Sequence, residues 1–61
     1  MIEVLYAYRT KDGVWRSYSK QFTDKLKAFR FIQVIKHSTK MILQGWSATD
    51  YYDREWLERR V

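Results

Sequence analysis

The sequence has no cysteine, no proline and only two glycines among its 61 residues. The absence of cysteine excludes a disulfide framework and a thiolate zinc site, which domains of this size commonly use as staples. Continuous apolar runs are short, the longest covering residues 4–8 and 41–43. Neither run approaches the length of a membrane span. We therefore expect no membrane contact, and with no basic leader at the first residues we expect a cytoplasmic protein.

Catalytic residue types are also scarce. The chain has one histidine and no glycine-rich loop that could cradle a phosphate, so nucleophile–base pairs and nucleotide sites are absent. His37 is expected to be a surface residue at the end of a helix. The acidic residues near the end could in principle gather round a metal ion. They alternate with arginines, however, and the spacings Asp50–Arg54 and Glu55–Arg59 are typical of helical ion pairs. We expect no enzyme, no cofactor, no metal and no small-molecule ligand.

Aromatic residues are abundant by contrast, with three Trp, five Tyr and three Phe making 18% of the chain. Each aromatic side chain can bury a large area, which compensates for the missing cross-links. At 46% hydrophobic residues the chain is too apolar to be a disordered tail. We expect one folded domain over residues 1–61, either alone or as an oligomer.

The positive charge lies on the body of the chain. Residues 1–49 hold nine Lys or Arg against three acidic residues, a net charge of +6, whereas residues 50–61 hold three Arg against four acids, a net charge of −1. A basic body favours a polyanionic partner such as DNA or RNA, because binding phosphates releases counterions. Charge of this size also serves solubility alone.

A β-hairpin is predicted over residues 2–22. Residues 2–8 and 14–22 are rich in β-branched and aromatic residues and are separated by residues 11–13, which end in Asp-Gly. A two-residue loop would scatter the apolar side chains over both faces. A three-residue loop with a left-handed glycine pairs Ile2 with Phe22 and Tyr6 with Tyr18, and we prefer it because it gathers the apolar set on one face. That face carries Ile2, Val4, Tyr6, Tyr8, Val14, Tyr18 and Phe22, and we expect its rings Tyr6, Tyr8, Tyr18 and Phe22 to lie in the core. The opposite face carries Leu5, Ala7, Arg9, Trp15, Ser17 and Ser19.

A helix should follow. Thr23 offers an acceptor for the cap and Asp24 a negative charge in the first turn. The helical spacing of the next apolar residues predicts a buried stripe. Its members are Ala28, Phe31, Ile32 and Ile35. Three further apolar residues, Leu26, Phe29 and Val34, widen the apolar arc, and residues 37–40 end the helix without a capping glycine.

The remaining chain completes an α+β fold. Residues 41–48 have the composition of a third strand, with Gly45 at a bulge or at a close backbone approach. This strand should run antiparallel to the first and beside it, giving the sheet order 2-1-3. Residues 49–61 are expected to form a helix capped by Asp50, although a fourth strand stays open. The whole is a ββαβ(α) unit with a three-stranded antiparallel sheet packed on one helix.

The candidate site combines cations and an aromatic side chain on the outer face of the sheet. Arg9 and Trp15 are expected cross-strand neighbours there, and Lys11, Arg16 and Lys20 border the hairpin. Cations that meet phosphates beside an exposed aromatic ring are typical of nucleic-acid binding. The alternative is that Trp15 is covered by the C-terminal segment and the charges only solvate the surface.

Two other surfaces are candidates. The predicted helix carries a second basic set, which consists of Lys25, Lys27, Arg30 and Lys36. The C-terminal segment carries an aromatic cluster, which consists of Tyr51, Tyr52, Trp56 and Leu57. Large side chains near a chain end imply docking, either onto this domain, which we favour, or onto a second copy.

One stretch resembles known sequences. The pattern lies in residues 45–57 and consists of Gly45-Trp46-Ser47, Asp50, Tyr52-Asp53 and Glu55-Trp56-Leu57. It is similar to the closing pattern of short uncharacterised proteins carried by phages and prophages of Gram-positive bacteria. The resemblance implies a cytoplasmic accessory protein of a mobile element, a setting in which DNA-binding factors and small inhibitors of host enzymes both occur.

Two functions follow as hypotheses. The first is a non-enzymatic module that contacts DNA or RNA through the five residues around the hairpin. The second is a protein-interaction module, a regulator or inhibitor and possible homodimer, that acts through an aromatic surface. The residues of that surface would be Phe29, Val34, Tyr52 and Trp56.

Overall fold

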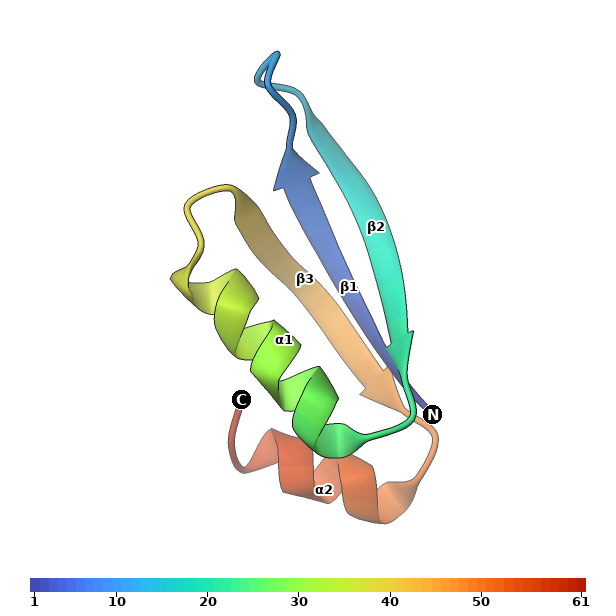
Figure 1. The fold of residues 1–61 in the computed structure, drawn as a ribbon. Coiled ribbons are helices and arrows are strands. Elements are labelled where there is room, and N and C mark those ends of the chain that lie inside the picture. Colours follow the sequence, from blue (N-terminus) through green and yellow to red (C-terminus); the bar gives the residue numbers. More distant parts are fainter.

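The computed structural model describes all residues from 1 to 61 and has five elements in the order ββαβα. The elements are β1 (Ile2–Arg9), β2 (Trp15–Phe22), α1 (Lys25–His37), β3 (Met41–Ala48) and α2 (Tyr51–Glu58). Both strand pairs are antiparallel, and the sheet order is β2-β1-β3. Figure 1 shows α1 running alongside the strands, next to β3, and α2 beneath the lower end of the sheet. The predicted α+β fold and strand order are confirmed.

The hairpin has the three-residue loop. Gly13 adopts a positive φ of 81°, and its amide donates to the Thr10 carbonyl at 3.0 Å. The Thr10 amide in turn donates to the Val14 carbonyl at 2.8 Å, which closes the turn. Ile2 therefore pairs with Phe22 and Arg9 with Trp15. A left-handed glycine at the end of residues 11–13 makes this register possible, because a side chain at that backbone conformation is strained.

Helix α1 begins one residue later than expected. Asp24 is the N-cap, its carboxylate accepts from the Leu26 amide at 2.9 Å, and the first turn holds no acidic residue. The expectation that Thr23 caps the helix is therefore wrong: both residues carry an acceptor, and the carboxylate takes the cap position. The helix ends at Ser38 without a glycine, with Lys36 and His37 in the last turn, where the helix dipole favours positive charge.

Strand β3 contains the bulge. Leu5 pairs with Gly45 but Tyr6 pairs with Leu43, so Gln44 is the extra residue. A Cβ atom added at Gly45 would meet nothing within 4 Å. Of the two roles considered for this glycine, the bulge is the correct one and the close backbone approach is not.

Helix α2 resolves the ambiguity of the C-terminal segment. Asp50 caps it by accepting from the amides of Tyr52 and Asp53. Its one buried residue, Leu57, joins the core, and Trp56 packs edge-on against Phe29 of α1 with ring centroids 5.7 Å apart. The segment therefore docks onto its own domain, and a fourth strand is excluded. Neither helix has the length and apolar character needed to cross a membrane.

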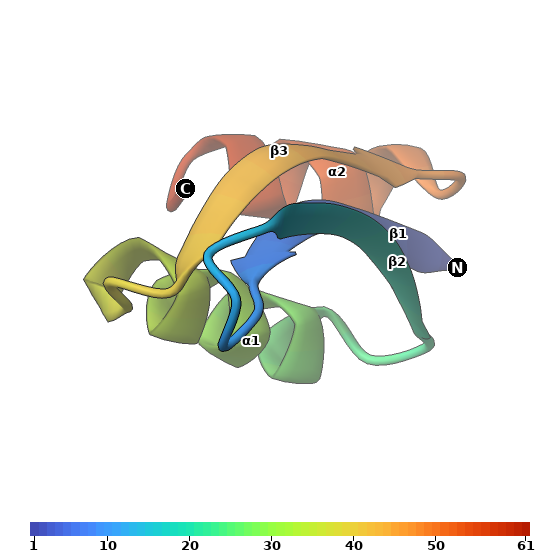
Figure 2. The same cartoon turned by 90° about the horizontal axis from the view of Figure 1, so that it is seen from above.

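The core occupies one face of the sheet and mainly its lower end. It consists of Ile2, Val4, Ala28, Ile32, Ile35, Ala48 and Leu57. Half-buried aromatic rings surround it, including Phe31, which packs edge-on against Tyr6 at 5.1 Å. In Figure 2, α1 lies on the concave side of the curved sheet.

Two residues expected in the core are exposed. Tyr8 and Tyr18 lie on the correct face but retain 40% and 44% of their accessible surface. Val14, predicted on the same face, precedes β2 and is 51% exposed. Tyr18 pairs with Tyr6 in the middle of the strands and is exposed because β2 is an edge strand that α1 covers less than it covers β1 and β3. For Tyr8 and Val14 the reason is a mismatch of lengths: α1, with 13 residues, is about 20 Å long, whereas each eight-residue strand spans about 26 Å and the loop adds more. The upper part of the hairpin therefore extends past the helix (Figure 1).

Candidate functional site

The part of the hairpin that extends past α1 comprises residues 8–16, which we call the hairpin tip. Only Thr10 within it is half-buried, and every other residue is exposed. Strand β2 is exposed along its whole length except at Phe22. Where it begins, the tip still adjoins β3, because Tyr8 pairs with Met41 and the Arg9 amide donates to the Lys40 carbonyl. Beyond Arg9 the tip is a two-stranded ribbon that meets solvent on both faces.

The outer face of the tip carries Arg9 and Trp15 as a cross-strand pair. Trp15 retains 43% of its surface. Helix α2 contacts β3 and α1, and its buried residue belongs to the core on the opposite face. The alternative interpretation, that the C-terminal segment covers Trp15, is therefore wrong. An indole ring stays open to solvent next to an arginine.

A basic hollow lies beside the end of β1. Its volume is about 330 Å³, and its lining includes the cations Arg9, Lys11 and Lys40 but no carboxylate. The Arg9 amide donates to the Lys40 carbonyl at 2.9 Å, which fixes the start of β3 next to Arg9. None of these three side chains forms an ion pair, since the single salt bridge of the molecule joins Arg59 to Glu55.

Lys40 was not among the site residues predicted from the sequence, although the strand order bears on its position. In an antiparallel pair of β1 and β3 the start of β3 lies near the end of β1, but the sequence predicts no register for these two strands. The structure pairs Met41 with Tyr8, and this register places Lys40 next to Arg9.

Arg16 and Lys20 lie on the other face. Arg16 pairs with Tyr8 and Lys20 with Val4, both on the side that faces α1. The Lys20 ammonium lies 5.0 Å from the ring centre of Phe31 and 5.5 Å from that of Phe22, which are cation–π distances. The structure therefore brings Arg9, Lys11 and Trp15 together with Lys40. Arg16 lies on the opposite face of the hairpin. Lys20 contacts the Phe22 and Phe31 rings, which border the core.

The four basic residues predicted on α1 differ in their exposure to solvent. Lys25 is half-buried, with its ammonium 5.5 Å from the centre of the Trp56 ring. Lys27, Arg30 and Lys36 are exposed. Only these three project into solvent, and they form no ion pair.

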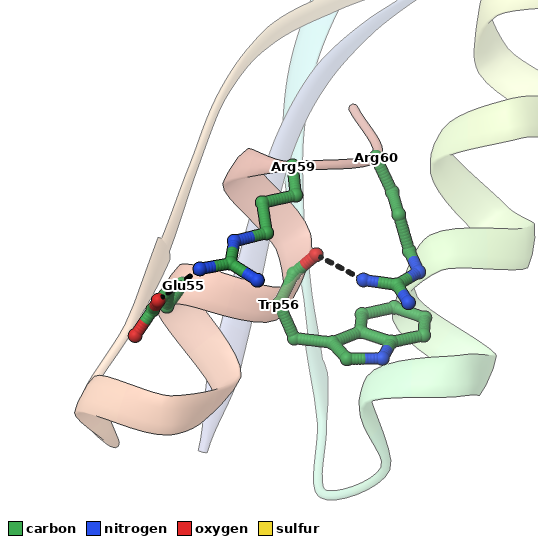
Figure 3. A network of polar contacts seen from close by, with 4 residues as sticks. All are labelled: Glu55, Trp56, Arg59 and Arg60. Carbon is green, nitrogen blue, oxygen red and sulfur yellow. Dashed lines mark hydrogen bonds and ion pairs between the residues drawn. The ribbon is translucent and has the colours of Figure 1, made fainter.

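The C-terminal aromatic cluster is divided between packing and exposure. The Arg60 guanidinium lies 4.0 Å from the Trp56 ring centre and donates to the Trp56 carbonyl at 3.1 Å, as Figure 3 shows. Trp56 and Phe29 are both half-buried against each other. Of the four residues predicted for protein interaction, only Val34, 55% exposed, and Tyr52, 78% exposed, stay open. They lie on different helices.

The acidic residues of α2 serve the helix itself. Asp50 is the cap, Asp53 lies in the first turn, and Glu55 accepts from Arg59 at 2.6 Å. The predicted Glu55–Arg59 pair is therefore confirmed. The Asp50 carboxylate instead accepts hydrogen bonds from the first amides of α2, and it forms no ion pair with Arg54. No group of three or more His, Asp or Glu side chains comes together with the geometry of a metal site.

Comparisons with known proteins add no relative. No protein-family model matches the sequence, and neither a curated protein nor a solved structure is similar enough to count as a match. We therefore infer the function from the geometry of the hairpin tip and of the hollow beside it.

Proposed function

We propose that this chain is a non-enzymatic module that contacts a nucleic acid with its hairpin tip. The observation that carries the proposal is the hollow lined by Arg9, Lys11 and Lys40, with no carboxylate in its lining and with the exposed Trp15 paired to Arg9. In this arrangement the three cations hold phosphates, and the indole ring stacks on a base or packs against a sugar.

Solubility alone accounts poorly for this arrangement. A solvating surface gains from cations but not from an exposed tryptophan, whose ring would be more stable buried. A nucleic acid uses both groups. Lys and Arg side chains that bind phosphates release the counterions condensed on the nucleic acid, which favours binding. A base stacked on an aromatic ring contributes about 1 to 3 kcal/mol.

The test is a titration of the protein into a fluorescently labelled oligonucleotide, followed by anisotropy at several salt concentrations. Binding should weaken steeply with salt. Arg9→Ala or Lys40→Ala should each weaken binding and lower the slope of log K against log salt by about one, because each removes one phosphate contact. Trp15→Ala should weaken binding without changing that slope.

Lys27→Ala is the matched control, since it removes one exposed positive charge from α1, away from the tip. It should leave the slope nearly unchanged. The proposal fails if no oligonucleotide binds at low salt. It also fails if Lys27→Ala weakens binding as much as Arg9→Ala does, because the charge would then act without a defined site.

A second candidate function rests on a different observation. Tyr51 and Tyr52 pack edge-on at 5.9 Å and yet remain 67% and 78% exposed, an unusual exposure for two neighbouring rings. A protein-interaction module, in its simplest form a homodimer, would cover them. Sedimentation velocity over a range of concentrations should then show a dimer that Tyr52→Ser dissociates, whereas a monomer throughout would contradict the homodimer.

A further inference from the structure

The hairpin tip has cations on both of its faces, and this distribution carries information about the shape of the ligand. Arg9 lies on the outer face, Arg16 lies on the face toward α1, and Lys11 lies in the loop between them. All three are exposed. The one acidic residue of the tip is Asp12.

The shape of the tip is equally specific. The molecule is 40 Å long against 18 and 14 Å in its other dimensions, and the tip forms one end of the long axis (Figure 1). Paired strands lie about 4.8 Å apart, so a two-stranded ribbon with its side chains is about as wide as a helix. The tip projects past the end of α1 and past the start of β3, so beyond the Tyr8–Met41 pair there is room on both of its faces (Figure 1).

From these observations, and resting on the proposed function, we infer that the ligand is double-stranded DNA and that the hairpin tip enters its major groove. The groove of B-form DNA is about 12 Å wide and admits a two-stranded β-ribbon. A phosphate backbone borders the groove on each side. A ribbon inserted there meets phosphates from both of its faces, and this arrangement employs Arg9 and Arg16 together.

A single strand fits the tip less well. It would lie along one face of the sheet and stack successive bases on several aromatic rings. The outer face offers only Trp15, because the next outward residues of β2 are Ser17, Ser19 and Gln21. A single strand held there by Trp15 and Arg9 would leave Arg16 without a phosphate. The face toward α1 does offer two exposed rings beside Arg16, those of Tyr8 and Tyr18. A strand on that face, however, would leave Arg9 and Trp15 unused.

Double-stranded RNA is disfavoured by its groove. The major groove of an A-form helix is deep and too narrow for protein elements to enter. A shallow contact with the RNA minor groove would again involve one face of the ribbon. The inference therefore separates three ligands that the proposed function alone treats alike.

The experiment compares one labelled sequence in three forms: a DNA duplex, its single strand, and the RNA duplex of the same sequence. The full chain should bind the DNA duplex most tightly. Arg16→Ala should lower the salt slope for the DNA duplex by about one and leave the weaker single-strand binding unchanged. Arg16→Lys should restore the slope, because it restores the charge, and Lys27→Ala again serves as the control.

A competition experiment identifies the groove. Methyl green, which lies in the major groove, should displace the protein from the DNA duplex, whereas the minor-groove ligand netropsin should not. Displacement by netropsin alone would overturn the inference. So would equal or tighter binding of the single strand or of the RNA duplex, or an Arg16→Ala variant with an unchanged slope on the DNA duplex. These results would leave the proposed function standing, while failure to bind all three probes would remove both.

Discussion

The two ends of the sheet differ in almost every physical respect. At the lower end, which we call the sheet base, Ile2, Val4 and Ala48 are buried under both helices. At the hairpin tip no side chain is buried, although the strands are the same and their pairing continues without interruption. The base is apolar and covered, whereas the tip is basic and open.

This difference separates folding from binding. Hydrophobic burial supplies most of the stability of a small domain, and here it is concentrated at the base. The tip contributes backbone hydrogen bonds but little burial, so its side chains are free to serve a ligand. We expect substitutions at the base to change stability and substitutions at the tip to change binding.

The largest expected effect is at the centre of the core. Ile32→Ala removes a fully buried side chain and should lower the free energy of unfolding by about 2 to 5 kcal/mol, measured by urea denaturation. Val14→Ala is the control at the tip, and it should cost no more than about 0.5 kcal/mol because Val14 is exposed. Similar losses at both sites would abolish the distinction between base and tip.

The next effect concerns the cap that holds α2 beneath the base. Asp50→Ala leaves two amides without their acceptor and should cost about 1 kcal/mol in the same assay. Asp50→Asn should retain most of the stability, since Asn caps helices about as well as Asp. An equal loss in both variants would mean that the charge, and not the hydrogen bonding, stabilises the helix.

At the tip, a loss of stability as large as that of Asp50→Ala is expected only from a change that strains the backbone. Gly13→Ala places a side chain at a φ of 81° and should cost about 1 kcal/mol, although nothing lies within 4 Å of the added atom. Gly13→Asn should cost less, because Asn tolerates positive φ better. Thermal unfolding followed by circular dichroism would measure both. An unchanged midpoint for Gly13→Ala would show that the turn relaxes freely.

The smallest effect should be that of the ion pair on α2. Glu55→Gln removes the partner of Arg59, whose side chain is 72% exposed while that of Glu55 is 40% exposed. We expect a loss of no more than about 0.5 kcal/mol, which high salt should abolish. A larger loss that persists in high salt would show that Glu55 contributes to the base by packing.

Much of the fold could be predicted from short-range signals. The turn at residues 11–13 and the alternation of apolar residues around it were sufficient to specify the register of the hairpin. The cap of α1 was wrong by one residue, because Thr23 and Asp24 are adjacent acceptors and their local sequence does not choose between them. Asp50 had no such competitor, and its cap was predicted correctly.

The extent of burial could not be predicted in the same way. Alternation along a strand indicates which face a side chain occupies, but it does not indicate how far the covering helix reaches. Tyr8 and Tyr18 were therefore assigned to the correct face and to the wrong environment. At the candidate site, the pairing of Arg9 with Trp15 followed from the register, whereas the engagement of Lys20 with Phe31 depends on packing between elements distant in sequence.

The three tryptophans occupy three different environments. Trp15 lies at the exposed tip, Trp46 is half-buried on the sheet near the core, and Trp56 packs between the helices beneath two cations. Because indole emission responds to polarity and to nearby quenchers, variants that keep one tryptophan and replace the others by phenylalanine would carry an intrinsic optical reporter for each region. Emission from Trp15 would follow occupancy of the tip while emission from Trp56 follows the docking of α2, so the two processes could be timed separately without attaching a dye.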